Sequence, residues 1–99
     1  MKPEEKKRLE ARARVLKALA QSARLGMVES LAGGEKCVCA LVEEAGLDFS
    51  TVSKHLTVLR NAGIVESDKR GKWVWYRLKV PCITGFLDCV DAVLKGKGA

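Results

Sequence analysis

Two amphipathic segments joined by the tripeptide Gly46-Leu47-Asp48 constrain the fold more than any other feature of this 99-residue chain. The first covers about residues 36–45 and the second about residues 49–62, and both carry apolar residues at helical spacing. Gly46 stands where a helix end requires a left-handed residue, and Asp48 is suited to cap the next helix. A three-residue turn that contains glycine between two helices is typical of a helix-turn-helix.

The hydrophobic period then changes from about 3.6 residues to 2. Residues 64–67 predict a short strand, residues 68–72 a charged turn, and residues 73–78 a second strand rich in aromatic and β-branched side chains. Together they predict a β-hairpin with a cationic tip. Trp73 and Trp75 share one face of the second strand, so we expect them to be packing residues on a face that a helix covers.

Three further helices are predicted, two before the helix-turn-helix and one after the hairpin. They cover about residues 1–20, 23–32 and 82–94. The predicted fold class is therefore mainly α with a small β-hairpin, a winged helix-turn-helix in the order helix, helix, helix, helix, strand, strand, helix. We expect one domain over residues 1–99, with its core at residues 15–80 and a C-terminal dimerisation helix at residues 81–95.

The charge of the chain indicates the kind of partner. Lys and Arg number 18 against 12 Asp and Glu, a net charge of +6. Such a surplus favours a polyanion, with nucleic acid first and an anionic membrane surface second. No apolar run approaches the roughly 18 residues of a membrane span, and the charged N-terminus is unlike a signal peptide. We therefore expect no membrane partner, a cytoplasmic location and reduced cysteines.

The predicted helix at residues 49–62 has two distinct faces. The apolar face consists of Val52, Leu56, Leu59 and Ala62. The opposite face, the polar stripe of Ser50, Ser53, Lys54, Thr57 and Asn61, carries short hydrogen-bonding side chains, one cation and no acid. Its candidate DNA-binding residues are Ser50, Ser53, Lys54 and Thr57. Small hydroxyl groups can approach phosphates and base edges closely, so this face predicts DNA recognition, with an ordinary solvated face as the alternative.

The hairpin supplies a second cationic cluster directly after this helix. Lys69, Arg70 and Lys72 are expected to contact the phosphate backbone or the minor groove, as the wing of a winged helix would. Exposed turns are often charged, so the position after a helix-turn-helix is what favours this interpretation.

Catalysis has no support in the sequence. The chain holds one histidine, His55, and has no dinucleotide fingerprint, no phosphate-binding loop and no zinc-protease motif. We expect no enzyme activity and no organic cofactor. His55 lies on the inner edge of its helix, where a hydrogen-bonded structural role is commoner than a role as a ligand.

Cys37 and Cys39 flank Val38 where a helix is predicted to begin. In a regular helix their sulfurs would point apart, but at an irregular first turn both can converge on one soft ion. A helix N-terminus also lowers the pKa of a thiol. Two thiolates do not complete a site, because zinc takes four ligands and softer ions take three. The alternative is that both are small buried residues.

Cys82 and Cys89 lie seven residues apart in the predicted terminal helix. The separation is about 10.5 Å in an unbroken helix, too far for one ion or one disulfide, so each needs another partner. The same helix carries more apolar surface than so small a core needs, which predicts a dimer interface. In the alternative, both cysteines are apolar contacts there.

The residues from Glu35 to Leu78 resemble the ArsR/SmtB family of winged-helix repressors. The segments most typical of that family are STVSKHLTVLRNAGIV and GKWVWYRL, and the preceding ALAQSARLGMVESLAGGE also fits. The resemblance covers about residues 15–78. It implies a dimeric repressor in which residues 49–62 form the recognition helix and residues 68–72 the wing, contacting double-stranded operator DNA.

The Cys37-Val38-Cys39 sequence resembles the arsenic-sensing and the cadmium- or lead-sensing branches. The arsenic pattern has a third cysteine where this chain has Val42, and the cadmium branch has cysteines near the N-terminus, where residues 1–36 have none. We therefore expect a three-sulfur site of Cys37, Cys39 and either Cys82 or Cys89, from the same or the partner subunit.

The zinc-sensing branch uses Asp, His and Glu on the last helix. Here that helix has Asp88 and Asp91 but no histidine, so we discount that site.

The function expected from these features is that of a transcriptional repressor that binds operator DNA as a homodimer through its N- and C-terminal helices. Its thiolates would capture arsenite or a similar thiophilic ion, such as antimonite, cadmium or lead, and the protein would then leave the DNA. A redox- or persulfide-responsive repressor of the same fold is one alternative. A thiol-metal buffer or small enzyme with incidental basic charge is another.

Overall fold

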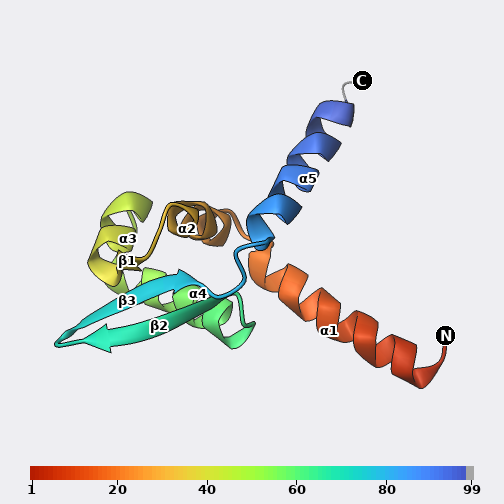
Figure 1. The fold of residues 1–99 in the computed structure, drawn as a ribbon, viewed down its shortest axis with the longest axis horizontal. Helices are drawn as coiled ribbons and strands as arrows, with labels where there is room; N and C mark the ends of the chain where they lie inside the picture. Colours follow the sequence, from red (N-terminus) through yellow and green to blue (C-terminus); the bar gives the residue numbers. More distant parts are fainter. Residues whose placement is uncertain (98–99) are drawn as a thin grey trace.

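The computed structural model describes residues 1–97, which form five helices and one three-stranded sheet (Figure 1). The elements in chain order are α1 (Pro3–Leu19), α2 (Ser22–Ala32), β1 (Lys36–Cys37), α3 (Val38–Ala45), α4 (Phe49–Asn61), β2 (Val65–Arg70), β3 (Trp73–Leu78) and α5 (Ile83–Lys97). This order agrees with the predicted winged helix-turn-helix except for β1, which the sequence did not predict.

The elements divide into a central group and two projecting helices. Helices α2, α3 and α4 gather with the sheet, whereas α1 and α5 run away from this group in different directions and carry the two termini (Figure 1). The molecule is therefore elongated, with extents of 48 × 37 × 22 Å. No helix within residues 1–97 is both long and apolar enough to span a bilayer.

The helix-turn-helix forms as the sequence predicts. Gly46 ends α3 with a φ of 65°, a conformation that glycine adopts without strain. The Asp48 carboxylate accepts a hydrogen bond from the backbone N–H of Thr51 at 3.3 Å and so caps α4. Gly46 and Asp48 thus mark the end of α3 and the start of α4.

Strand β1 corrects the prediction that a helix begins at Lys36. Lys36 pairs with Tyr76 and Cys37 with Trp75, so β1 adds a third strand to the hairpin in the order β1-β3-β2. Cys37 has an extended backbone and is the N-cap of α3, which begins at Val38. Two residues are too few to show a period, and their strand conformation depends on pairing with β3, a long-range contact.

The predicted charged turn at residues 68–72 is too long. Strand β2 extends to Arg70, which pairs with Trp73, so the turn is only Gly71 and Lys72. Gly71 has a φ of 63°, as two-residue hairpin turns require. Lys69 and Arg70 consequently lie on a strand, with fixed directions, and only Lys72 lies at the tip.

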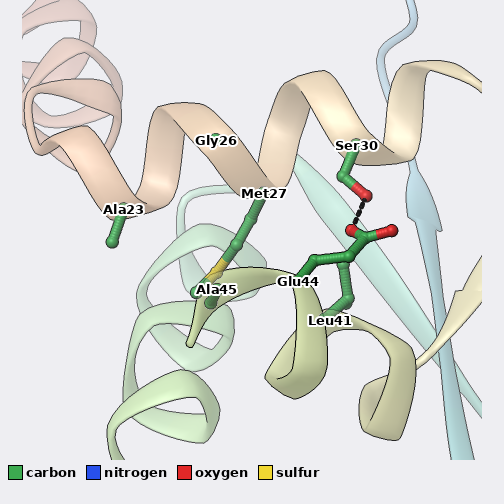
Figure 2. A pocket seen from close by; sticks show the side chains of 7 residues that line it. All are labelled: Ala23, Gly26, Met27, Ser30, Leu41, Glu44 and Ala45. Carbon is green, nitrogen blue, oxygen red and sulfur yellow. Dashed lines mark hydrogen bonds between the residues drawn. The ribbon is translucent and has the colours of Figure 1, made fainter. Parts of the chain in front are cut away.

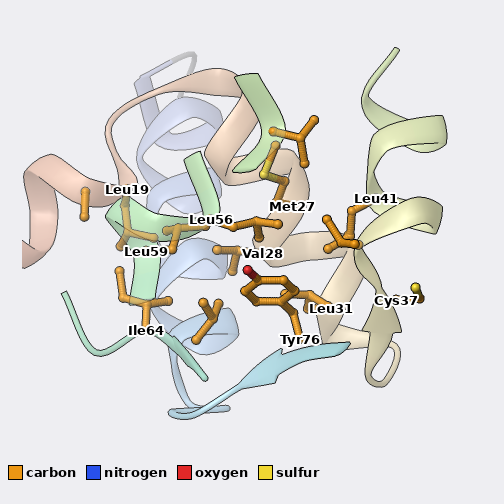
Figure 3. Close-up of a cluster of buried hydrophobic side chains, with 14 residues drawn as sticks. Leu19, Met27, Val28, Leu31, Cys37, Leu41, Leu56, Leu59, Ile64 and Tyr76 are labelled. Atoms are coloured by element: carbon orange, nitrogen blue, oxygen red, sulfur yellow. The ribbon is translucent and has the colours of Figure 1, made fainter. Parts of the chain in front are cut away.

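A single apolar core joins the central group (Figure 3). The α4 side chains Val52, Leu56 and Leu59 are fully buried, as predicted from their spacing. Tyr76 contributes from β3 and is 6% exposed. The prediction that a helix covers Trp73 is wrong, because its side chain remains 49% exposed. Strand β3 directs its opposite face, which includes Tyr76, toward the helices.

Helix α5 also differs in its bounds. It begins at Ile83, so Cys82 precedes it, and it continues to Lys97 rather than ending near Leu94. Residues 98–99 of the predicted loose tail lie outside the described residues.

Candidate nucleic-acid interface and thiol pair

The polar stripe of α4 faces away from the core. Ser50 and Lys54 are exposed, and Ser53 and Thr57 are half-buried. Thr57 donates its hydroxyl hydrogen to the Ser53 carbonyl at 2.9 Å, so its oxygen remains free to accept. Lys54 makes no ion pair within residues 1–97. The stripe thus offers a row of small hydrogen-bonding groups and one cation whose charge no ion pair offsets.

The three wing cations have different surroundings. The Arg70 guanidinium donates to both carboxylate oxygens of Glu35 at 2.8 and 3.0 Å and to Asp68 at 3.1 Å. It also lies over the Trp75 ring, 5.2 Å from its centroid. Arg70 holds the pKa of Glu35 below its usual range, chiefly through these hydrogen bonds. Most of its charge is therefore already paired within the chain.

Lys69 and Lys72 are the wing cations left for an external anion. Both are exposed, and neither makes an ion pair in the part of the chain that the structure describes. The Lys72 ammonium lies 5.7 Å from the centroid of the exposed Trp73 ring, so it is directed along the outer face of the hairpin.

Glu35 has a structural role that the sequence did not indicate, since its carboxylate pairs with arginines of the wing. It pairs with Arg70 and lies 3.9 Å from Arg77, whose own guanidinium donates to Glu66 at 2.7 Å. This network ties the residue before β1 to both long strands of the wing. Glu35 and Arg70 are far apart in the chain, and only the pairing of β1 with β3 reveals their contact.

The thiols of Cys37 and Cys39 lie side by side, with the Cys39 thiol donating to the Cys37 sulfur at 2.9 Å. Cys37 is buried at 7% exposure, whereas Cys39 is exposed. The pKa of Cys39 is raised, first by this hydrogen bond and then by burial and the neighbouring sulfur. The expectation of a lowered pKa is therefore wrong for Cys39. The Cys37 thiol raises the pKa of Cys39 by more than the N-terminus of α3 lowers it.

The structure does not bring the other cysteines to this pair. Cys82 and Cys89 are both exposed, on the segment before α5 and on α5 itself. Within residues 1–97, no three His, Cys, Asp or Glu side chains gather closely enough to hold a metal ion. One subunit thus supplies two sulfurs at one place, and a three-sulfur site would need a ligand from elsewhere.

His55 has a structural hydrogen bond, in agreement with its predicted role. Its Nδ1 lies 3.2 Å from the Arg24 guanidinium, which also donates to the carbonyl oxygen of Ala18 at 2.6 Å. Arg24 thus connects α2 to α4 and to the C-terminal end of α1.

A pocket of about 240 Å³ separates part of α2 from α3 (Figure 2). At one end Ser30 of α2 donates to Glu44 of α3, and Lys36 of β1 pairs with the same carboxylate at 2.6 Å. Lys36 and then Ser30 hold the pKa of Glu44 below its usual range. Helix α3 is therefore attached to α2 and β1 by polar contacts at its edge, next to incompletely filled space.

The helix-turn-helix followed by a paired hairpin defines a winged helix-turn-helix domain. The model of the family described as "Bacterial regulatory protein, arsR family" matches residues 21–67. The chain belongs to this family, which consists of regulators and not enzymes, as the sequence predicts. The thiol-metal buffer or small enzyme is therefore not retained.

Two relatives illustrate the similarity. The chain is 42% identical over 85 residues to the arsenic resistance transcriptional regulator ArsR1 of Pseudomonas putida, covering 83% of this chain and 62% of the relative. An uncharacterized HTH-type transcriptional regulator of Methanocaldococcus jannaschii is 34% identical over 83 residues, covering 83% of this chain and 93% of the relative. The chain thus spans less than two thirds of the Pseudomonas protein.

A solved structure shows the same fold. The homodimeric winged helix-turn-helix DNA-binding domain of a possible ArsR-family regulator from Mycobacterium bovis superposes with a TM-score of 0.83 at 30% identity. The match covers 96% of this chain and 88% of the Mycobacterium chain.

Proposed function

We propose that this chain is a cytoplasmic transcriptional repressor that binds operator DNA as a homodimer and leaves it when its thiolates capture arsenite or another thiophilic ion. The observation that carries the ion-sensing part is the 2.9 Å contact between the sulfurs of Cys37 and Cys39. This pair lies at the junction of β1 with α3, the first helix of the helix-turn-helix. The names of relatives such as the Pseudomonas arsenic resistance regulator support the same class of inducer.

DNA recognition is assigned to α4 and the wing. The α4 stripe of Ser50, Ser53, Lys54 and Thr57 enters the major groove, where small polar groups contact base edges and phosphates. Lys69 and Lys72 bind the phosphate backbone, while Arg70 mainly holds the wing to Glu35. Two recognition helices in a dimer would contact half-sites about 34 Å apart.

Dimerisation is assigned to α1 and α5. Between them lies an apolar groove of about 260 Å³ lined by residues that include Leu16, Phe86 and Val90. These side chains are 48%, 43% and 41% exposed, and Val93 and Leu94 farther along α5 are more exposed still. Apolar surface of this kind in a small domain favours a second copy, and the homodimeric Mycobacterium relative supports this.

Ion capture needs a third sulfur in addition to Cys37 and Cys39. Since no complete set gathers within residues 1–97 of one subunit, we assign the third ligand to Cys82 or Cys89 of the second copy. Binding would displace the N-terminal end of α3, whose later residues Leu41, Glu44 and Ala45 line the open space between α3 and α2. The ion releases DNA only if it binds the DNA-incompetent arrangement better, and a few kcal/mol is enough.

The test is fluorescence anisotropy of the reduced protein on labelled duplex DNA from upstream of its own gene, with and without arsenite. Tight, salt-sensitive binding that arsenite abolishes is expected. The variants Cys37→Ser and Cys39→Ser should keep their affinity for DNA and lose release by arsenite. Because Cys39 is exposed, Cys39→Ser should fold as the wild type does. Arsenite-driven release that persists in both variants would remove this thiol pair from the mechanism.

The redox-responsive repressor stays as a second candidate because the same two sulfurs are already in contact. An oxidant such as a peroxide would take two electrons and two protons from two thiols, and a disulfide would form. DNA release by peroxide that a dithiol reverses, without bound metal, is expected in that case. Mass spectrometry that finds all four thiols free after mild oxidation would exclude it.

A further inference from the structure

A basic surface outside the wing lies between α1 and the C-terminal end of α4, where it adjoins the recognition stripe. It is an open pocket of about 420 Å³, and the side chains that line it include Arg14, Lys17, Arg24 and Asn61 but no acid. The sequence assigned α1 to dimerisation alone. A concentration of cations without a carboxylate favours an anionic partner at this place.

Only two of the three cations are available to such a partner. Arg24 donates to the carbonyl oxygens of Ala18 and Lys17, at 2.6 and 3.3 Å, and contacts His55 at 3.2 Å, so it fixes the end of α1 in place. Arg14 and Lys17 are exposed on α1, and neither makes an ion pair with any residue that the structure describes. Their side chains are free to bind an external anion.

The position of this pocket relative to α4 indicates which anion it would bind. Asn61 lies on the polar stripe, eleven residues beyond Ser50 and four beyond Thr57, and it also lines the pocket. Val58 of α4 lines the pocket too. On the other edge of α4, Arg60 lies 3.4 Å from Ser67 of the wing. The recognition stripe is therefore bordered by the wing on one side and by Arg14 and Lys17 on the other.

We propose that Arg14 and Lys17 bind DNA phosphates on the side of the major groove opposite the wing. A helix in the major groove lies between two phosphate backbones, so cations on both borders of the helix would contact both strands. Such contacts set the position of α4 in the groove and carry no sequence preference. The inference rests on the proposed DNA-binding function and assigns α1 a role in it.

The experiment compares the double variant Arg14→Ala/Lys17→Ala with Arg12→Ala, which removes a cation from the same helix outside the pocket. Affinity for a duplex from upstream of the gene, and for a scrambled duplex of equal composition, is measured by anisotropy over 50 to 300 mM salt. Each lost phosphate contact lowers the slope of log affinity against log salt by about 0.9, so four contacts per dimer lower it by roughly 3 to 4. We expect the double variant to show this smaller salt slope on both duplexes, and Arg12→Ala to keep the slope of the wild type on both.

The outcomes separate this inference from the function on which it rests. Sedimentation equilibrium first establishes that both variants have the oligomeric state of the wild type. A double variant of unchanged oligomeric state whose salt slope equals that of Arg12→Ala would overturn the role of Arg14 and Lys17 and leave DNA binding intact. Wild-type protein that binds neither duplex with a salt-dependent affinity would overturn the proposed function itself.

Discussion

The helix-turn-helix core and the two projecting helices bury their apolar residues to very different degrees. In the core, Val28, Val52 and Leu56 have 0% exposure, whereas Val93 and Leu94 on α5 are 65% and 69% exposed. The core is therefore filled within one chain, whereas the apolar side chains at the far end of α5 remain exposed. Helices α1 and α5 project from the central group (Figure 1). This difference is consistent with a DNA-binding unit that folds by its own contacts, and with the proposed role of the terminal helices in pairing two such units on DNA.

The largest effect is expected from Leu56→Ala in the core. Leu56 is fully buried on the inner face of α4, and truncating a buried leucine costs about 2 to 5 kcal/mol of unfolding free energy. Urea denaturation followed by circular dichroism measures this loss. The control is Leu94→Ala on the exposed part of α5. A smaller loss of unfolding free energy for Leu56→Ala than for Leu94→Ala would contradict the division between the core and the projecting helices.

The second prediction concerns association. Phe86 lines the apolar groove and is 43% exposed, so Phe86→Ala should leave the helix content unchanged and weaken self-association about 30-fold, or about 2 kcal/mol. Sedimentation equilibrium checks this, and Asp91→Ala on the same helix is the matched control. Equal dissociation constants for the two variants would show that this face of α5 is not the interface.

A smaller, pH-dependent effect is expected from three exposed carboxylates, two in the helix-turn-helix and one that pairs with the wing. Arg70, Lys36 and Thr51 hold the pKa values of Glu35, Glu44 and Asp48, respectively, below their usual range. Groups whose pKa is lower in the folded state stabilise it above their unfolded pKa, near 4, and lose this contribution as the pH falls through the folded value.

The urea midpoint should therefore decrease between pH 5 and pH 3, and 1 M salt should diminish the decrease. Glu44→Gln should reduce the pH dependence, whereas Glu4→Gln on the exposed first turn of α1 should not. Identical pH profiles for these two variants would show that the ion pair of Glu44 with Lys36 does not contribute to stability.

The smallest effect is expected at Trp73. Its ring is half exposed on the outer face of the wing, so Trp73→Ala should change the unfolding free energy by about 0.5 kcal/mol or less. Tyr76→Ala, three residues along the same strand and buried, should cost several times more. Urea denaturation of both variants tests whether the two faces of β3 differ as their exposure indicates.

Local signals in the sequence predicted most of the helical framework. Gly46 and Asp48 marked the turn, and the spacing of Val52, Leu56 and Leu59 identified the buried face of α4. Strand β1 was missed because its conformation depends on pairing with β3, which no local pattern encodes. The wrong expectation for Trp73 has a related cause, since alternation assigns side chains to two faces without indicating which face the helices cover.

The placement of the candidate residues could be predicted where it depends on neighbours in the chain. The outward direction of the α4 polar stripe and the contact between the Cys37 and Cys39 sulfurs are two such cases. The sequence could not show that Arg70 is paired with Glu35, or that Arg14 and Lys17 lie beside α4, because these relations depend on tertiary contacts. The raised pKa of Cys39 likewise depends on the direction of a neighbouring thiol.

Under the proposed ion-sensing function, the unequal burial of the two adjacent thiols determines how the ligand site would change during evolution. Cys37 is part of the apolar core and of strand β1, so its replacement disturbs packing as well as ligand chemistry. Cys39 is exposed, and its replacement alters the ligand set at little cost to the fold. Selection for a different inducer would therefore act first on residue 39 and on the exposed cysteines, while residue 37 stays under structural constraint.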